Sequence, residues 1–332
     1  MGQFFTLLKG GNKPSLIAAV VNTIIAALKG GAFFLTGNVA MFAEMMHSIG
    51  DAANQFFVFI GSALSKKAPT PKFPNGFGRL VNLVCLGAVI LVGILSYETI
   101  KEGWHHIQHP VASGGLAITL SVLAIAIILE FVVLYKAGKE ILHEVGIKGT
   151  FLAPLTTSFT HLNRAKPATK LVFMEDLVAT SGGILAFVAV LISHFTGFLQ
   201  AEGIASILIG LMMFYVVGKV FLDNARGALG ETDEQMLVHI AHVISDVKEV
   251  KDIQQLEVIK EGEYLHVTLI AEVDASLSFA TVDDIHDVLK NLILSQQGVA
   301  DVTISFDEDD GVRTWKHHKD TKTVLKTNDK NK

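Results

Sequence analysis

Cysteine, proline and charged residues are all scarce in this chain of 332 residues. It has one cysteine, Cys85, and seven prolines, and 18% of its residues are charged, whereas about 25% is usual in soluble domains. A single cysteine excludes an intramolecular disulfide and a zinc site built from several cysteines. Any metal site must therefore use mainly histidine, carboxylate or hydroxyl ligands. The formal net charge of −5 gives no basis for expecting a nucleic acid partner.

Long apolar runs fill the first two thirds of the chain. Half of all residues are hydrophobic, and the mean hydropathy is +0.47. A helix of about 20 apolar residues crosses a bilayer. We expect six such spans, at residues 14–36, 39–64, 80–100, 115–137, 171–196 and 202–225. The first is too long and begins too late for a cleaved signal peptide, so we expect it to be retained.

Basic residues predict how the spans are oriented. Lysine and arginine gather at the N-terminus, after the second and fourth spans and at the end of the sixth, whereas the connections after the third and fifth spans have few. Because cytoplasmic loops carry the excess of lysine and arginine, both termini are expected in the cytoplasm. The N-terminus lacks an arginine- and serine-rich targeting stretch, which favours a bacterial cytoplasmic membrane.

After Arg226 the composition becomes that of a small soluble domain. Apolar periodicity predicts helices over residues 231–247 and 282–293 and strands over 253–259, 264–273 and 299–306. This αββαβ order is sufficient for a two-layer α+β sandwich. The predicted organisation is a cytoplasmic N-terminus (1–13), an α-helical transmembrane domain (14–226), the cytoplasmic α+β domain (227–307) and a disordered polar tail (308–332).

The second span carries ionisable side chains at membrane depth. Each costs roughly 2.5–3.5 kcal/mol at a helix centre, so each is a candidate functional group. His47 and Asp51 are four residues apart and share one helix face, and an imidazole with a carboxylate is half of a tetrahedral zinc site. Glu44 and Asn54 extend the same stripe. They are weaker candidates, because residues that hydrogen-bond between helices follow the same pattern.

The fifth span opens with further carboxylates. Asp176 and Thr180 share a face, whereas Glu175 is rotated from it by about 100°. One more carboxylate here is sufficient to close a metal site with His47 and Asp51. Asp176 is the first choice, and Glu175 and Thr180 are alternatives. The helix dipole alone also favours a carboxylate at a helix start.

Two other charges lie at membrane depth, Lys29 in the first span and Glu130 in the fourth. For both we expect an ion pair with a structural or gating role rather than metal ligation. Cys85 is expected to be a small packing residue.

The second span resembles a known signature. Residues 36–55 read Thr-Gly-Asn-Val-Ala-Met-Phe-Ala-Glu-Met-Met-His-Ser-Ile-Gly-Asp-Ala-Ala-Asn-Gln. The cation diffusion facilitator family has a small-residue turn here, followed by Ala-Glu/Asp, a His-Ser pair and an Asp. Weaker matches follow in order at residues 74–79, 175–176, 182–183 and 203–206, so the resemblance covers residues 14–307.

The resemblance implies a homodimeric secondary transporter that exports Zn²⁺, or a similar divalent cation, from the cytoplasm by proton antiport. It implies six transmembrane helices in the lipid bilayer, a ferredoxin-like cytoplasmic domain, no enzymatic activity and no cofactor besides the transported metal ion and H⁺. The family's transport site lies between the second and fifth spans, and His47 and Asp51 match its second-span ligands. Val172 stands where a histidine is usual in the fifth span. The pair Glu175–Asp176 resembles a variant subgroup that includes mitochondrial zinc transporters and their bacterial relatives.

Some members bind additional metal in the cytoplasmic domain. Ser305 stands where those members have a histidine. The histidines of this domain match no metal position of the family, so we expect isolated surface residues; they are His239, His242, His266 and His286. The role of His317 and His318 in the tail stays open.

Three alternatives remain. One imidazole with two carboxylates suits Zn²⁺ best and leaves Mn²⁺, Fe²⁺ and Co²⁺ open. A membrane-anchored, metal-responsive scaffold is the second alternative, and it predicts binding without flux. An intramembrane enzyme is the weakest, because the sequence has neither His-Glu-x-x-His nor Gly-x-Ser-x-Gly.

Overall fold

The computed structural model describes residues 7–8, 10–73, 76–147, 151–162, 167–262 and 264–315. The chain divides into two compact units, one of Met1–Lys67 with Val81–Ala225 and one of Ala68–Leu80 with Arg226–Lys332. Each unit is described by itself. The disorder expected for the tail falls mostly on residues outside the described part, as do His317 and His318.

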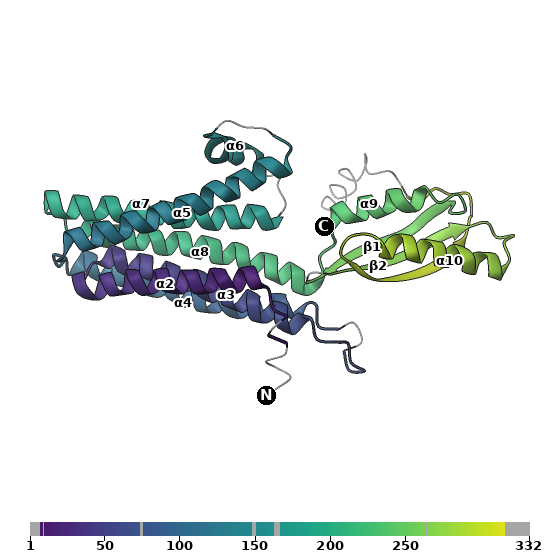
Figure 1. Cartoon of the computed structure of the whole chain (residues 1–332), viewed down its shortest axis with the longest axis horizontal. Helices are drawn as coiled ribbons and strands as arrows, with labels where there is room; N and C mark the ends of the chain where they lie inside the picture. The colour runs from purple at the N-terminus through teal and green to yellow at the C-terminus, as the bar shows by residue number, and fades with distance from the viewer. Residues whose placement is uncertain are drawn as a thin grey trace, which may run out of the picture. The chain divides into compact units, whose positions relative to one another are not determined.

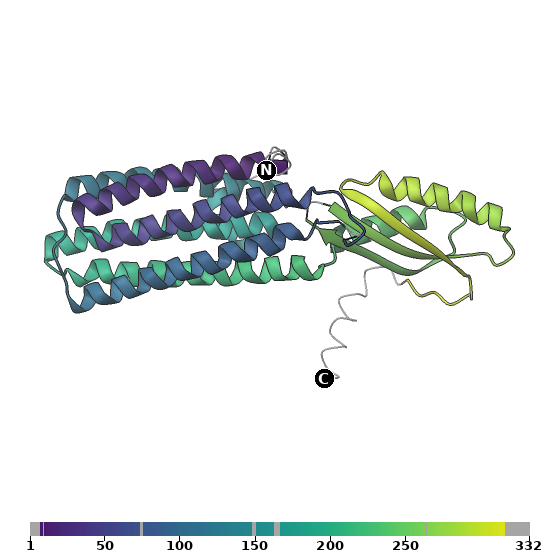
Figure 2. The ribbon, with the colours of Figure 1, turned by 90° about the horizontal axis from the view of Figure 1, so that it is seen from below.

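The first unit is a bundle of long helices that run side by side (Figures 1 and 2). They are α2 (Lys13–Thr36), α3 (Val39–Ser65), α4 (Leu80–Gln108), α5 (Leu116–Glu144), α7 (Pro167–Thr196) and α8 (Gln200–Leu229). Within the described residues, five of them are long and apolar enough to cross a membrane, and α3 is not among the five. At 27 residues α3 is long enough to cross a bilayer, but its polar stripe lowers its hydropathy. Five of the six predicted spans are therefore confirmed by length and composition. These five helices make the chain a multi-pass membrane protein.

A tight turn joins α2 to α3 and fixes how they pair. Gly37 has a φ of +66°, which residues with a Cβ rarely adopt. Asn38 caps α3, and its side chain accepts a hydrogen bond from the Met41 backbone N–H at 2.9 Å. The two helices therefore run back along each other, which brings Lys29 of α2 beside Glu44 of α3.

A short helix that the sequence did not predict, α6 (Ala153–His161), packs against α5. The contact is at Gly138, where a Cβ would lie 2.0 Å from the Pro154 carbonyl oxygen. The Ser158 hydroxyl donates to the Gly138 carbonyl oxygen at 2.9 Å. The segment reads APLTTSFTH and has no clear apolar repeat. The sequence therefore indicated only a connection rich in lysine and arginine here.

The second unit has the predicted αββαβ order. Its elements are α9 (Glu234–Ser245), β1 (Asp252–Glu261), β2 (Tyr264–Val273), α10 (Phe279–Leu294) and β3 (Val299–Glu308). The central strand β2 pairs antiparallel with β1 and parallel with β3. Fully buried residues from both helices and β2 form the core, among them Ile240, Leu269 and Leu289.

The close approach of α5 and α6 predicts a glycine-specific effect. Gly138→Ala places a methyl group against the Pro154 backbone, so α6 must shift, and overpacking of this kind costs about 1–3 kcal/mol. The melting temperature in detergent should fall. Gly93→Ala in α4 is the matched control, because nothing lies within 4 Å of the added methyl group, and it should leave melting unchanged or slightly raised. Equal melting of the two variants would contradict this contact.

Candidate metal site

Helix α3 presents the predicted pair on one face. His47 is buried, with 6% of its surface exposed, and Asp51 is half-buried. The His47 Nε2 atom lies 3.5 Å from Asp51 Oδ2. The i,i+4 spacing read from the sequence therefore brings an imidazole and a carboxylate within contact distance.

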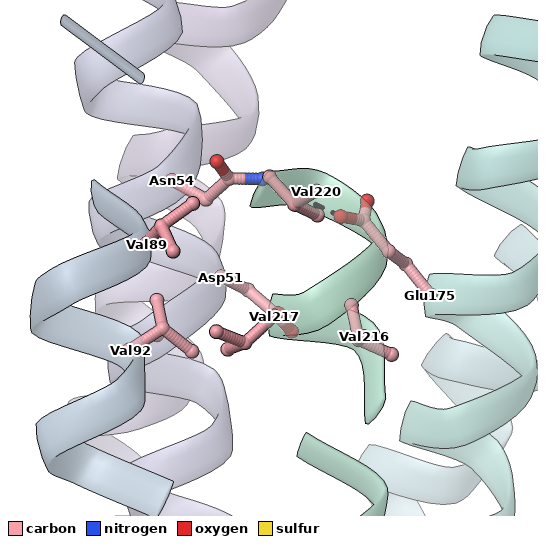
Figure 3. A pocket seen from close by; sticks show the side chains of 9 residues that line it. Asp51, Asn54, Val89, Val92, Glu175, Val216, Val217 and Val220 are labelled. Carbon is pink, nitrogen blue, oxygen red and sulfur yellow. Dashed lines mark hydrogen bonds between the residues drawn. The ribbon is translucent and has the colours of Figure 1, made fainter. Parts of the chain in front are cut away.

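Asp51 lines a small pocket that reaches from α3 to α7. The Asn54 side chain donates to Glu175 Oε1 at 3.5 Å, and Figure 3 shows the two residues extending towards each other across the pocket. Valines of α4 and α8 form most of the remaining wall. The cavity volume is about 30 Å³, which has room for one ion or water molecule but not for an organic substrate.

Two buried atoms on the adjacent turns of α3 and α7 make no hydrogen bond within the described residues. They are Asp176 Oδ2 and His47 Nε2, which has the Asp51 carboxylate 3.5 Å away. A buried polar atom without a partner costs free energy. An imidazole nitrogen and a carboxylate oxygen are both zinc ligands, so these unpartnered atoms fit a bound cation.

The candidates do not yet form a closed site. In the described part of the chain, no three His, Cys, Asp or Glu residues are grouped closely enough to hold a metal ion. The Thr180 hydroxyl donates to the Asp176 backbone carbonyl at 2.8 Å. Val172, at the family's histidine position, is 46% exposed. Glu175 and Asp176 are therefore the remaining candidate ligands on α7.

The two other membrane-depth charges form an ion pair, as predicted, and Glu44 belongs to the same cluster. Lys29 Nζ lies 2.7 Å from Glu44 Oε2 and 2.9 Å from Glu130 Oε1. Lys29 and Glu44 are fully buried, and the Glu130 side chain is 13% exposed. Glu44, a weaker candidate for metal ligation, thus has one oxygen bound to Lys29. We call these three residues the lysine triad.

Two glycines of α7 make room for the lysine triad. A Cβ at Gly182 would lie 2.9 Å from Glu44 Oε1, and one at Gly183 would lie 3.3 Å from Glu130 Oε2. Gly183 is seven residues after Asp176, two turns along the same face of α7. On α3, Glu44 is likewise seven residues before Asp51. The triad therefore lies two turns from the pocket, on the same helix faces.

Three histidines of the second unit contact residues of that unit. His239 Nε2 is 2.8 Å from Gln296 Oε1, and His286 Nδ1 is 3.4 Å from Asp287 of the same helix. His266 lies 3.5 Å from Glu261 and 4.0 Å from Asp301. The sequence did not predict this last grouping, because its members come from three different strands.

Comparisons with known proteins find similarity over most of the chain. Residues 15–227 match the family model described as the cation efflux transmembrane domain. The chain is 25% identical over 255 residues to the mouse (Mus musculus) protein named proton-coupled zinc antiporter SLC30A9, mitochondrial, a match that covers 74% of this chain and 44% of that protein. It is 23% identical over 243 residues to zinc transporter ZitB of Escherichia coli, covering 72% of this chain and 67% of that protein. The chain thus spans less than half of the mitochondrial relative's length.

The lysine triad predicts a large effect of one substitution. Lys29→Met leaves two carboxylates without their cation, and breaking a buried ion pair costs about 3–5 kcal/mol. The melting temperature in detergent should fall clearly, and a second substitution, Glu44→Gln, should restore part of it by removing one unpaired charge. Lys101→Met is the control, because Lys101 is exposed and pairs with Glu98 on the surface. Wild-type melting of Lys29→Met would contradict the structural role of the triad.

Proposed function

The chain belongs to the cation efflux family, and we propose that it is a secondary transporter that exports Zn²⁺ in exchange for protons. The family and the zinc transporters among the relatives support metal transport. The observation that carries the proposal is the ion-sized pocket between α3 and α7, with Asp51 and Glu175 in its wall. On the adjacent turns, His47 Nε2 and Asp176 Oδ2 are buried and make no hydrogen bond within the described residues.

Three side chains bind the ion in this proposal: His47 through Nε2, Asp51, and Asp176 through Oδ2. Glu175, which accepts a hydrogen bond from Asn54, is the nearest additional carboxylate. Because these groups come from two helices and do not form a closed group within the described residues, binding requires α3 and α7 to approach. An ion that binds better in the closed arrangement stabilises that arrangement. Metal binding and helix movement are thereby coupled.

Proton exchange follows from the same ligands. A metal ion binds neutral imidazole and ionised carboxylates, so it competes with protons for these groups. Protons that arrive from the opposite side of the membrane expel the ion, and no separate proton site is needed. One imidazole with carboxylates suits Zn²⁺, and Mn²⁺, Fe²⁺ and Co²⁺ are the competing ions.

The proposal includes a topology and an assembly. The lysine and arginine distribution supports a cytoplasmic position for both termini, which fits a bacterial cytoplasmic membrane. The α2–α3, α4–α5 and α7–α8 connections then face outward. As the family resemblance implies, the transporter is a homodimer whose αββαβ domain is ferredoxin-like.

Transport in proteoliposomes with an imposed pH gradient tests the proposal. Wild-type protein should move Zn²⁺ only while the gradient lasts, and Asp51→Asn should lower the rate to that of empty vesicles, because a neutral amide is a poor zinc ligand. Asp301→Asn is the matched control, since this aspartate is 70% exposed in the second unit, and its rate should equal that of wild type.

Three outcomes would contradict the proposal in different ways. Zinc transport by Asp51→Asn at the wild-type rate would exclude the α3–α7 pocket as the transport site. Flux of Mn²⁺ or Fe²⁺ without zinc flux would overturn the choice of ion. Binding without flux of any ion would favour the scaffold alternative.

A further inference from the structure

A second cavity lies at the other end of the bundle, beside the α4–α5 and α7–α8 connections. Its volume is about 180 Å³, and the polar side chains that line it belong to Ser113, Thr119, Ser193, His194 and Glu202. Glu202 is fourteen residues before Val216, which lines the α3–α7 pocket. The two cavities are therefore separated by about 20 Å along α8. Glu202 is not conspicuous in the sequence, because it lies at the edge of an apolar span.

Glu202 is a buried carboxylate with one unused oxygen. It is 1% exposed. Its Oε1 atom accepts a hydrogen bond from the Ser113 hydroxyl at 2.9 Å, whereas Oε2 has no partner among the described residues. The Thr119 hydroxyl, in a residue that is also 1% exposed, has no partner there either. The helix dipole stabilises a carboxylate in the first turn of α8, but it gives Oε2 no hydrogen-bond partner.

Hydrogen bonding indicates that Glu202 acts as an acceptor. The Asn38 side-chain amide donates to Ser113 Oγ at 3.1 Å, and Ser113 in turn donates its single proton to Glu202. Asn38 is itself fixed as the cap of α3. Glu202 Oε1 therefore accepts a hydrogen bond from a donor that is itself held in place, and Oε2 is available to bind a ligand.

The charge of this carboxylate has no basic partner in the cavity. No lysine or arginine is among the residues that line it, in contrast to the carboxylates of the lysine triad. Its only nitrogen-bearing lining side chain is His194, which is exposed. The cavity thus joins an accessible imidazole to a buried carboxylate and hydroxyl groups, a donor set for a divalent cation.

We propose that this cavity is a second cation site, in which Glu202, His194 and the neighbouring hydroxyl groups bind a divalent ion at the end of the bundle formed by the α4–α5 and α7–α8 connections. A single carboxylate makes the site weaker than the α3–α7 pocket, which suits an ion about to leave. The proposed ion binding is argued only from the side chains that line this cavity. Its place in export, as the site from which the metal ion is released, rests on the proposed function.

Zinc binding to full-length protein without the first site tests this proposal. In a His47→Ala, Asp51→Asn, Asp176→Asn background, equilibrium binding of Zn²⁺ should show weak residual binding, which Glu202→Gln should reduce roughly tenfold or more. Glu98→Gln, which changes an exposed carboxylate, is the matched control and should leave the residual binding intact. His194→Ala should also reduce the binding, and this exposed substitution carries little risk of misfolding.

The outcomes separate this inference from the proposed function. Residual binding that is lost with Glu202→Gln and His194→Ala supports the site even where the wild-type protein moves no zinc. In an active transporter, Glu202→Gln alone should slow flux while zinc affinity of the first site stays at its wild-type value. No residual binding, or residual binding that both substitutions leave intact, would overturn the second site.

Discussion

A charge buried at membrane depth requires a partner of opposite sign, and this requirement decides how the long helices associate. Lys29 of α2 contacts Glu44 of α3 and Glu130 of α5, so one side chain ties three helices. Gly182 and Gly183 bring the backbone of α7 against the same carboxylates. Because lipid tails are as apolar as the helix surfaces, polar contacts and small residues determine which helices pack together.

The same requirement explains the three levels of polar residues along α3. Asn38 leads through Ser113 to the Glu202 cavity, Glu44 belongs to the lysine triad, and Asp51 lines the α3–α7 pocket. Of these three, only Glu44 is paired with a lysine, Lys29. Neither cavity has a lysine or arginine among its lining residues. In our account, a mobile cation supplies at these two levels the charge that Lys29 supplies permanently between them.

Relations within one helix were readable from the sequence, and relations between helices were not. The spacing of His47 and Asp51 predicted their contact, and apolar periodicity predicted the αββαβ order. The ion pair of Lys29 was expected, but its partner Glu130 is 101 residues away, a contact that only the packing of α2 on α5 creates. Helix α6 was missed because nine residues rich in threonine and serine have no clear apolar repeat. Glu202 was missed because its burial depends on the connections that cover it.

The most direct test of the central claim is the ligand shell of bound metal, measured by X-ray absorption spectroscopy on the protein loaded with one Zn²⁺ per chain. The account predicts nitrogen and oxygen ligands only, with one imidazole. No sulfur from cysteine is expected among the ligands, because the single cysteine, Cys85, is buried in α4 as a free thiol. The imidazole signal should disappear in His47→Ala once His194→Ala has also removed the imidazole of the second cavity, and Asp176→Asn should change the oxygen shell. A zinc spectrum that stays the same in both variants would contradict a transport site between α3 and α7.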